Sequence, residues 1–300
     1  MDWATLAFLH TGLQAWVSIL DKYNVSRLVR DVRTYYLMLG VLSLGFGIVT
    51  IVLFPVQDGA PTTAILLAIA SGLARGSALM ITFIVYQTQE VSRVVPVTQS
   101  FPIFVAIIAS IFLDEILGPL EWGAILVTVA GVVLISFQRV PGKGGIPLGL
   151  PFLFMVGISL LLALSSVLSK AALADISVWN MYSFTIIFAG GSFLTLGLRA
   201  HTIREALALV RTPRGVLLPI TVMLVTLGGN LLLFSSFERG PVSLASTIVG
   251  TRPLFVFIYS ALITWLFPRV MYEPLTPKVA MVKLVSIALI VSGGVTLALR

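Results

Sequence analysis

The chain has 300 residues, of which 58% are hydrophobic and only 10% are charged. Soluble domains carry about 25% charged residues, so this chain has too little charge to cover a water-exposed surface, and we expect lipid to surround it. The absence of cysteine excludes disulfides, thiolate metal sites and cysteine nucleophiles. The two histidines, His10 and His201, form no metal-binding pattern, and we predict no cofactor. The net charge of +7 lies mainly in a few loops, where it indicates membrane orientation rather than nucleic-acid binding.

Apolar runs of about 20 residues recur along the chain without the strict alternation of barrel strands, so they predict transmembrane helices. We therefore predict an all-α integral membrane protein with ten transmembrane helices. The predicted spans are 3–20, 34–54, 63–87, 94–113, 120–137, 148–168, 179–198, 216–237, 242–267 and 279–299. Residues 199–215 predict a surface amphipathic turn or short helix. The N-terminus lacks the basic region of a cleavable signal peptide, so we expect none.

The two halves of the chain repeat each other. A Gly/Pro-rich connection at 141–145 separates five spans from five, which gives two five-helix repeats, 1–140 and 146–300, that we expect to form one transport unit. Three short matches fall in the same order in both halves: 18–22 with 166–170, 102–105 with 253–256, and 131–134 with 294–297. Because five is odd, the second half must cross the membrane in the opposite sense, as in the inverted repeats of many secondary transporters.

Lysine and arginine are distributed unevenly between the two sides of the predicted membrane. Fourteen of the 19 lie in loops after odd-numbered spans, whereas only Lys170, Arg239 and Arg300 lie on the opposite side. Cytoplasmic loops are enriched in these residues, so the count predicts that the odd-numbered loops are cytoplasmic and that both termini are outside. Residues 21–33 form the first of these loops, and we expect them to be solvated.

Residues 93–137 contain a series of short motifs. They are Val95-Pro96, Pro102, Phe112-Leu113-Asp114-Glu115, Gly123-Ala124 and Gly131-Val132-Val133-Leu134. Together with the Ser-x-Leu-x-Lys endings of the first and sixth spans, this series resembles the drug/metabolite transporter superfamily, in its ten-helix EamA-type branch. The resemblance implies two inverted repeats around a central cavity that carries small metabolites, frequently outward. It also implies cytoplasmic termini, opposite to the charge count, which leaves orientation and transport direction open.

Two arginines, Arg75 and Arg252, fall inside predicted spans. A charge at the centre of a membrane helix costs at least about 2.5–3.5 kcal/mol, and such residues usually have a function. The acidic residues fall at span ends, so we expect a substrate carboxylate or phosphate to supply the partner, which the planar guanidinium group suits. The alternative is that each arginine links helices through backbone carbonyls freed by prolines.

Pro102 and Pro253 occupy matching positions in the two repeats. Each removes a backbone donor and should bend its helix. Polar residues flank both bends, and we assign Gln99 and Thr251 as substrate-binding candidates, because broken helices near the midplane form the sites of many transporters. A purely structural kink is the alternative, since proline is common in membrane helices.

His10, Gln14 and Ser18 form a polar stripe at helical spacing on the first span. We assign Gln14 as a candidate for substrate binding. His10 is the candidate for proton coupling, because imidazole titrates near physiological pH, and an interhelical hydrogen bond is the alternative. Asn230, beside a Gly-Gly pair in the eighth span, presents the same choice between binding substrate and linking helices.

These features predict a secondary transporter, not an enzyme, that moves a small anionic or zwitterionic metabolite, such as an amino acid or organic acid, by alternating access. We expect an exporter in the inner (plasma) membrane, a monomer or homodimer whose partners are the substrate and the bilayer. An exporter of cationic or hydrophobic drugs is the first alternative, but it would need a central acid. An intramembrane lipid-processing enzyme is the second, but it would need clustered acids, histidines or metal ligands.

Overall fold

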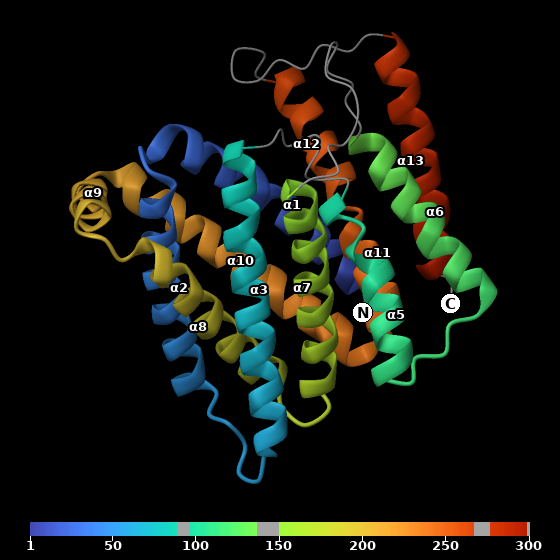
Figure 1. Ribbon diagram of the computed structural model, residues 1–300, viewed down its shortest axis with the longest axis horizontal. Coiled ribbons are helices and arrows are strands. Elements are labelled where there is room, and N and C mark those ends of the chain that lie inside the picture. The colour runs from blue at the N-terminus through green and yellow to red at the C-terminus, as the bar shows by residue number, and fades with distance from the viewer. Residues whose placement is uncertain (89–96, 137–149, 267–276, 299–300) are drawn as a thin grey trace.

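The computed structural model describes residues 1–88, 97–136, 150–266 and 277–298, and regular structure within these ranges is entirely helical (Figure 1). The elements are α1 (Trp3–Tyr23), the π-helical turn η1 (Asn24–Leu28), α2 (Val32–Leu53), α3 (Thr62–Thr88), α5 (Phe101–Phe112), α6 (Pro119–Ser136), α7 (Leu150–Ala172), α8 (Val178–Gly197), α9 (Ala200–Val210), α10 (Pro213–Arg239), α11 (Val242–Gly250), α12 (Arg252–Leu266) and α13 (Pro277–Ala298). The prediction of an all-helical chain is confirmed for these residues. Each predicted span contains one or two of the helices, and α9 lies where a short amphipathic helix was predicted.

The long helices have the length and composition of membrane spans. Among the described residues, five segments are long and apolar enough to cross a membrane, or six if α8 and α9, which meet at 115°, count as one. Further apolar helices, including Phe101–Phe112 and Leu284–Leu297, are shorter. Leu53 and Phe112 are 66% and 74% exposed, as expected for side chains that contact lipid. The chain is therefore a multi-pass membrane protein, while the ten-span arrangement stays a prediction.

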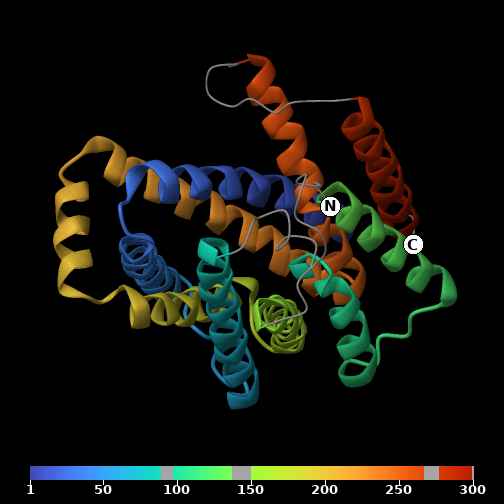
Figure 2. The ribbon, with the colours of Figure 1, turned by 45° about the horizontal axis from the view of Figure 1, so that its top comes forward.

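The two halves of the chain pack intimately against each other. α1 packs on α10, α2 on α8, α3 on α7, α5 on α11, and α6 on α13. Figures 1 and 2 both show α1 in blue lying beside α10 in orange. Counted by predicted span within each half, the first pairs with the third, the second with the second, the third with the first, and the last two with their equivalents. This pattern is unchanged when the halves are exchanged, which is what a pseudo-two-fold axis between two repeats produces.

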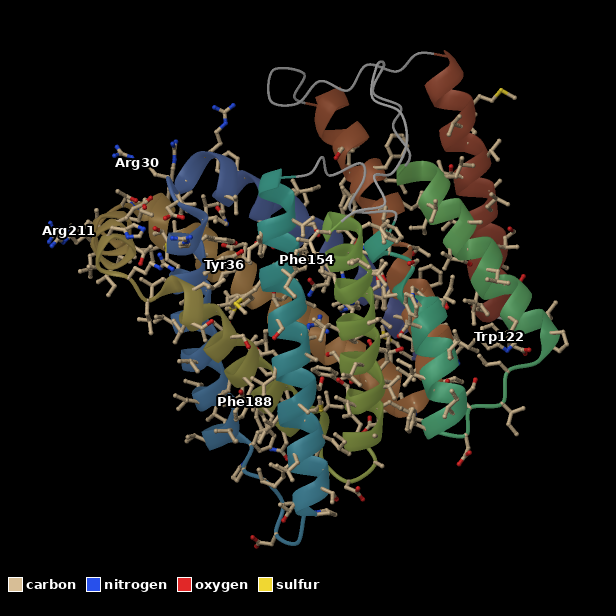
Figure 3. All side chains as sticks on the ribbon, in the orientation of Figure 1. Arg30, Tyr36, Trp122, Phe154, Phe188 and Arg211 are labelled. Carbon is tan, nitrogen blue, oxygen red and sulfur yellow. The ribbon has the colours of Figure 1, made fainter. Side chains whose placement is uncertain are left out.

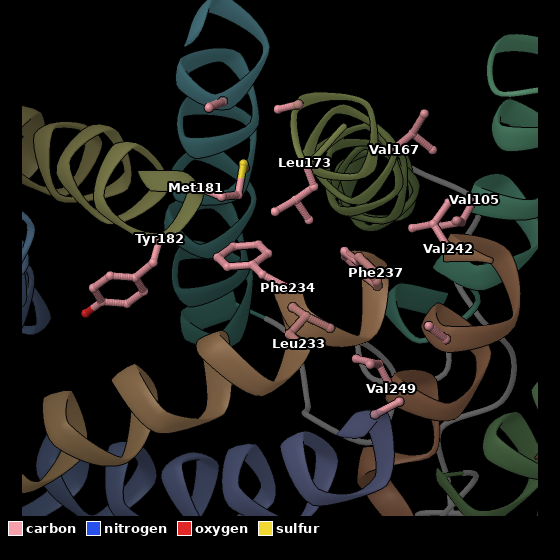
Figure 4. Packing of buried hydrophobic residues seen from close by; sticks show 14 of the residues in the cluster. Val105, Val167, Leu173, Met181, Tyr182, Leu233, Phe234, Phe237, Val242 and Val249 are labelled. Atoms are coloured by element: carbon pink, nitrogen blue, oxygen red, sulfur yellow. The ribbon is translucent and has the colours of Figure 1, made fainter. Parts of the chain in front are cut away.

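The largest apolar cluster lies where α7, α8, α10 and α11 meet (Figure 4). Phe234 and Phe237 of α10 are almost fully buried beside Met181 of α8 and Val249 of α11. In lipid the hydrophobic effect does not drive helices together, so this contact depends on close packing. The cluster fixes the position of α10, and α10 also carries Gly229 and the polar Asn230.

Small residues hold α3 against its neighbours on two sides. Gly72 and Gly76, four residues apart, face α8 so closely that a Cβ atom on Gly76 would lie 2.7 Å from Cα of Ala189. On the side of α7, the Ser71 hydroxyl lies 3.0 Å from that of Ser165 and 2.8 Å from that of Ser169. Small-residue contacts and hydroxyl hydrogen bonds are the usual means by which membrane helices associate. They fix the rotation of α3 and therefore the direction of Arg75.

Polar contacts dock α9 on the start of α2. Glu205 accepts hydrogen bonds from the backbone N–H of Arg30 at 2.7 Å and from the Thr34 hydroxyl at 2.8 Å. His201 pairs with Asp31 at 2.9 Å. Burial raises the pKa of Asp31, but the Arg33 backbone N–H and His201 outweigh it, so the net pKa is lowered. Figure 3 shows Arg30 and Arg211 projecting at this end of the molecule.

Replacement of Gly76 by alanine should lower the melting temperature in detergent micelles. The new methyl group would meet the backbone of α8, and such overpacking typically costs about 1–3 kcal/mol. Gly45→Ala on α2 is the matched control, because no atom lies within 4 Å of the added Cβ. Equal melting temperatures for Gly76→Ala and wild type would contradict the close contact of α3 with α8.

Candidate functional site

The polar stripe of α1 faces α10. His10 is fully buried, and its Nδ1 lies 2.7 Å from the carbonyl oxygen of Gly229. A carbonyl can only accept a hydrogen bond, so Nδ1 must carry the proton. The interhelical hydrogen bond named in the sequence analysis as an alternative for His10 is therefore present. It leaves Nε2 uncommitted, and this atom has no hydrogen-bond partner among the described residues.

Gln14 lies one turn further along α1 and contacts the same glycine. Its Nε2 atom would be 2.9 Å from a Cβ atom on Gly229, so the missing side chain leaves the room that the Gln14 amide fills. The Gln14 side chain is 7% exposed, and its Nε2 atom has no hydrogen-bond partner within the described part of the chain. α1 and α10 thus approach closely at Gly229 because that residue has no side chain.

Arg75 reaches the next residue of α10. Its Nη2 donates to Oδ1 of Asn230 at 3.3 Å, a long hydrogen bond. Asn230 is buried, whereas Arg75 is partly exposed. Because Gly229 and Asn230 are consecutive, His10 and Arg75 are bonded to positions whose Cα atoms are only about 3.8 Å apart. Four of the predicted site residues, from three helices and both halves of the chain, therefore meet at one place: His10, Gln14, Arg75 and Asn230.

The fourth and ninth predicted spans are broken by the same turn. Ser100 (φ −80°, ψ 0°) precedes α5, and Thr251 (φ −75°, ψ 2°) precedes α12. The hydroxyl of each donates at 2.6 Å to the carbonyl three residues earlier. Pro102 and Pro253 then occupy the first turn of the following helix, where a missing backbone N–H has no cost. The spans are therefore interrupted just before the prolines rather than bent at them.

The two breaks are adjacent in space. The Pro102 ring packs against Gly250, where a Cβ atom would lie 2.9 Å from the ring Cγ. Gln99 is partly exposed, and its carbonyl oxygen would lie 3.7 Å from a Cβ atom on Gly250. The Thr251 side chain is buried, with its hydroxyl proton directed to the backbone. These two candidates thus line the breaks, while the arginines carry the charge.

Arg75, Arg252 and His10 lie close enough together to interact electrostatically. Arg75 and Arg252 repel each other, and both act on His10. Arg252 is partly exposed at the first residue of α12. No described carboxylate lies within ion-pair distance of Arg75, which donates a hydrogen bond to the neutral side chain of Asn230. Arg75 therefore contributes a positive charge that no described carboxylate offsets by an ion pair.

The expectation that the segment from Asp21 onward is a solvated loop is wrong for its first residues. Asp21 lies in the last turn of α1 and accepts a hydrogen bond of 2.5 Å from Tyr35, which in turn accepts one of 3.3 Å from Asn24. Tyr35 and Asn24 are fully buried, because η1 prolongs α1 and α2 covers it. Arg252 also acts electrostatically on Asp21. The polar stripe of α1 continues in register to position 21, and that spacing was the overlooked signal.

Two charged residues close the junction between α10 and α11. Glu115 accepts hydrogen bonds from the backbone N–H groups of Val242 at 2.6 Å and Ser243 at 3.2 Å, which caps α11. Lys170 donates to the carbonyls of Phe237 at 2.5 Å and Gly240 at 3.0 Å. A carboxylate at a helix N-terminus and an ammonium at a C-terminus both complement the helix dipoles. Lys170 and Glu115 accordingly fix the C-terminal end of α10 and the N-terminal end of α11.

The comparisons with known proteins assign the class. The model of the EamA-like transporter family matches residues 23–137 and again 149–269. The chain therefore belongs to the EamA-like transporter family, and its two halves each correspond to one copy of the family unit. The proteins of this family are membrane transporters and not enzymes. Among the described residues no group of three histidines, cysteines or acids could hold a metal ion.

One solved structure shows the same fold. It is titled only "Crystal structure of protein", is 16% identical in sequence and superposes with a TM-score of 0.69 over 100% of this chain and 98% of its own. At that identity the likeness establishes the fold alone. No curated protein sequence matches the chain.

Gly229→Ala should displace the Gln14 amide and weaken ligand-induced stabilisation, with little effect on the unliganded melting temperature. The contact is made by the end of a flexible side chain, which can move aside. Gly228→Ala is the matched control, since no atom lies within 4 Å of its added Cβ. If both variants respond to ligand as the wild type does, Gln14 has no part in the site.

Proposed function

We propose that the chain is a secondary transporter for a small anionic or zwitterionic metabolite, such as an amino acid or organic acid, and that it works by alternating access as an exporter in the plasma membrane. The observation that carries the proposal is the Arg75 guanidinium inside the helix bundle, which donates to the neutral Asn230 and has no described carboxylate within ion-pair distance. A bound carboxylate or phosphate would supply a negative partner for Arg75. Arg75 and Arg252 would bind it, and Asn230 would orient Arg75.

The repeat architecture supports the mechanism. Ten spans arranged as inverted repeats would bring the two broken helices together near the midplane, where transporters of this design bind their substrates. Gln99 and Thr251 line these breaks and Gln14 lies beside Gly229, which supports all three as candidate polar neighbours of a bound anion. The matched turns at Ser100 and Thr251 are candidate pivots, because an interrupted helix can change its angle without losing regular hydrogen bonds.

His10 has two candidate roles. Its Nε2 atom could take up a proton and so couple transport to a proton gradient, or it could accept a hydrogen bond from the ligand. The two roles exclude each other at any one moment, because a protonated Nε2 can no longer accept. Protonation would also place a third positive charge beside Arg75 and Arg252 unless an anion were bound.

An exporter of organic cations is the second candidate and has one observation in its favour. Asp21 is a carboxylate held in a largely buried setting within the electrostatic reach of Arg252. However, Asp21 is engaged by Tyr35, and a cation that approached it would also meet the field of Arg252. The anion proposal requires no such compensation.

Arg75→Gln and Arg252→Gln should each abolish stabilisation by the anionic ligand in a thermal-shift screen of amino acids, organic acids, sugar phosphates and organic cations. The unliganded variants should remain folded, because each removes one of two repelling charges. Arg204→Gln on the exposed face of α9 is the control and should respond to ligand normally. Stabilisation of the wild type by organic cations alone would overturn the proposal.

The absence of cysteine makes orientation directly measurable. We expect a cysteine introduced at Arg204 to be protected from an impermeant thiol reagent in whole cells, and one introduced at Asp58 to be labelled. This outcome follows from the excess of arginine around α9. Labelling of position 204 would reverse the topology and place both termini in the cytoplasm.

A further inference from the structure

The face of α1 toward α10 carries polar atoms that binding of an anion by the arginines leaves unused. Nε2 of His10 and Nε2 of Gln14 are both buried, and neither has a hydrogen-bond partner among the described residues. Buried polar atoms in proteins are nearly always paired, because an unpaired one loses its hydrogen bond to water without replacement. Two such atoms one helical turn apart, next to a charged group, therefore point to a ligand.

The chemistry of the two atoms is complementary. Nδ1 of His10 donates to Gly229, so Nε2 of the neutral ring presents a lone pair and accepts. Nε2 of the Gln14 amide donates. A group that pairs with both must donate one hydrogen bond and accept another. A hydroxyl does this, whereas an ammonium group has no lone pair with which to accept from Gln14.

The position of these atoms relates the hydroxyl to the charged group. His10 is bonded to Gly229, and Arg75 to Asn230, the next residue of α10. Arg75 and Arg252 both lie close enough to act on His10 electrostatically, so one small molecule could contact the histidine and a guanidinium group. An ammonium group at the same place would also be repelled by Arg75 and Arg252, which both act on His10.

We propose that the site selects a hydroxylated anion, such as a hydroxy acid, a sugar acid or a sugar phosphate. Its charged group binds Arg75 and Arg252, and its hydroxyl donates to Nε2 of His10 and accepts from Nε2 of Gln14. This inference rests on the proposed anion transport and narrows it from anions and zwitterions to anions that carry a hydroxyl. Both Nε2 atoms are closed to solvent in this conformation, so the ligand reaches them only after the surrounding helices rearrange while the hydrogen bond from His10 to Gly229 is kept. Alternating access supplies such a movement.

The test compares ligands that share a carbon skeleton and an anionic group and differ only in their hydroxyl or ammonium substituents. One set is lactate, propionate and alanine; the second is malate, succinate and aspartate; the third is glycerol 3-phosphate and propyl phosphate. Each compound is titrated against the purified full-length protein in a thermal-shift assay. In at least one set the hydroxylated member should bind about tenfold more tightly or better, because the analogue leaves both buried atoms unpaired.

His10→Asn is the diagnostic variant. The asparagine amide can replace Nδ1 as donor to Gly229 but has no counterpart of Nε2, so the variant should still bind the anion and lose the preference for the hydroxyl. His201→Asn, at the other histidine of the chain, is the control and should keep it. Gln14→Met provides a second variant with the same expected loss, should His10→Asn fold poorly.

The outcomes separate the two proposals. Equal binding within every set, tighter binding of the amino member, or an unchanged preference in both His10→Asn and Gln14→Met would overturn the selection of a hydroxyl and leave anion transport standing. If no carboxylate or phosphate stabilises the wild type, anion transport fails and the hydroxyl preference fails with it.

Discussion

Two consecutive residues of α10 hold the centre of this molecule together. The carbonyl of Gly229 accepts from His10, and the amide oxygen of Asn230 accepts from Arg75. Through these bonds α1 and α3, both from the first half of the chain, are tied to one helix of the second half. The other packing features serve this arrangement. Phe234 and Phe237 anchor α10 from its other side, and Gly229 has no side chain to keep α1 away.

The same arrangement keeps a charged group where lipid would otherwise exclude it. Two arginines that repel each other would drive their helices apart unless other contacts opposed the repulsion. The contacts that hold α3, the helix of Arg75, are made by small residues. Gly72 and Gly76 pack closely against α8, and the Ser71 hydroxyl is hydrogen-bonded to α7. α3 therefore cannot rotate about its axis to turn the guanidinium away from α10. A group held in this way is preorganised for an anion, which is the condition for tight and selective binding.

The sequence was sufficient for features that depend on spacing along the chain. Helical periodicity placed His10 and Gln14 on one face, and the repeat aligned Pro102 with Pro253. It could not show which backbone atom His10 would meet, because Gly229 is more than two hundred residues away and a carbonyl has no sequence signature. The same holds for Glu115, because the helix that it caps, α11, lies in the other half of the chain. Asp21 was misplaced because a charged residue near a span end was taken as solvated, although Tyr35 covers it.

The breaks at Ser100 and Thr251 show how a repeated fold can serve a substrate that has no symmetry. Their backbone angles and hydroxyl hydrogen bonds are nearly identical, so both halves retain the same means of changing direction. The next residue differs: Phe101 is buried in the largest apolar cluster, whereas its equivalent in the second half, Arg252, is partly exposed. The repeat thus supplies a helix break common to both halves, and a difference between the halves at the next position supplies a charge. Because Arg75, from the first half, faces Arg252, from the second, the anion we propose would bridge the repeats and could respond to a change in their relative position.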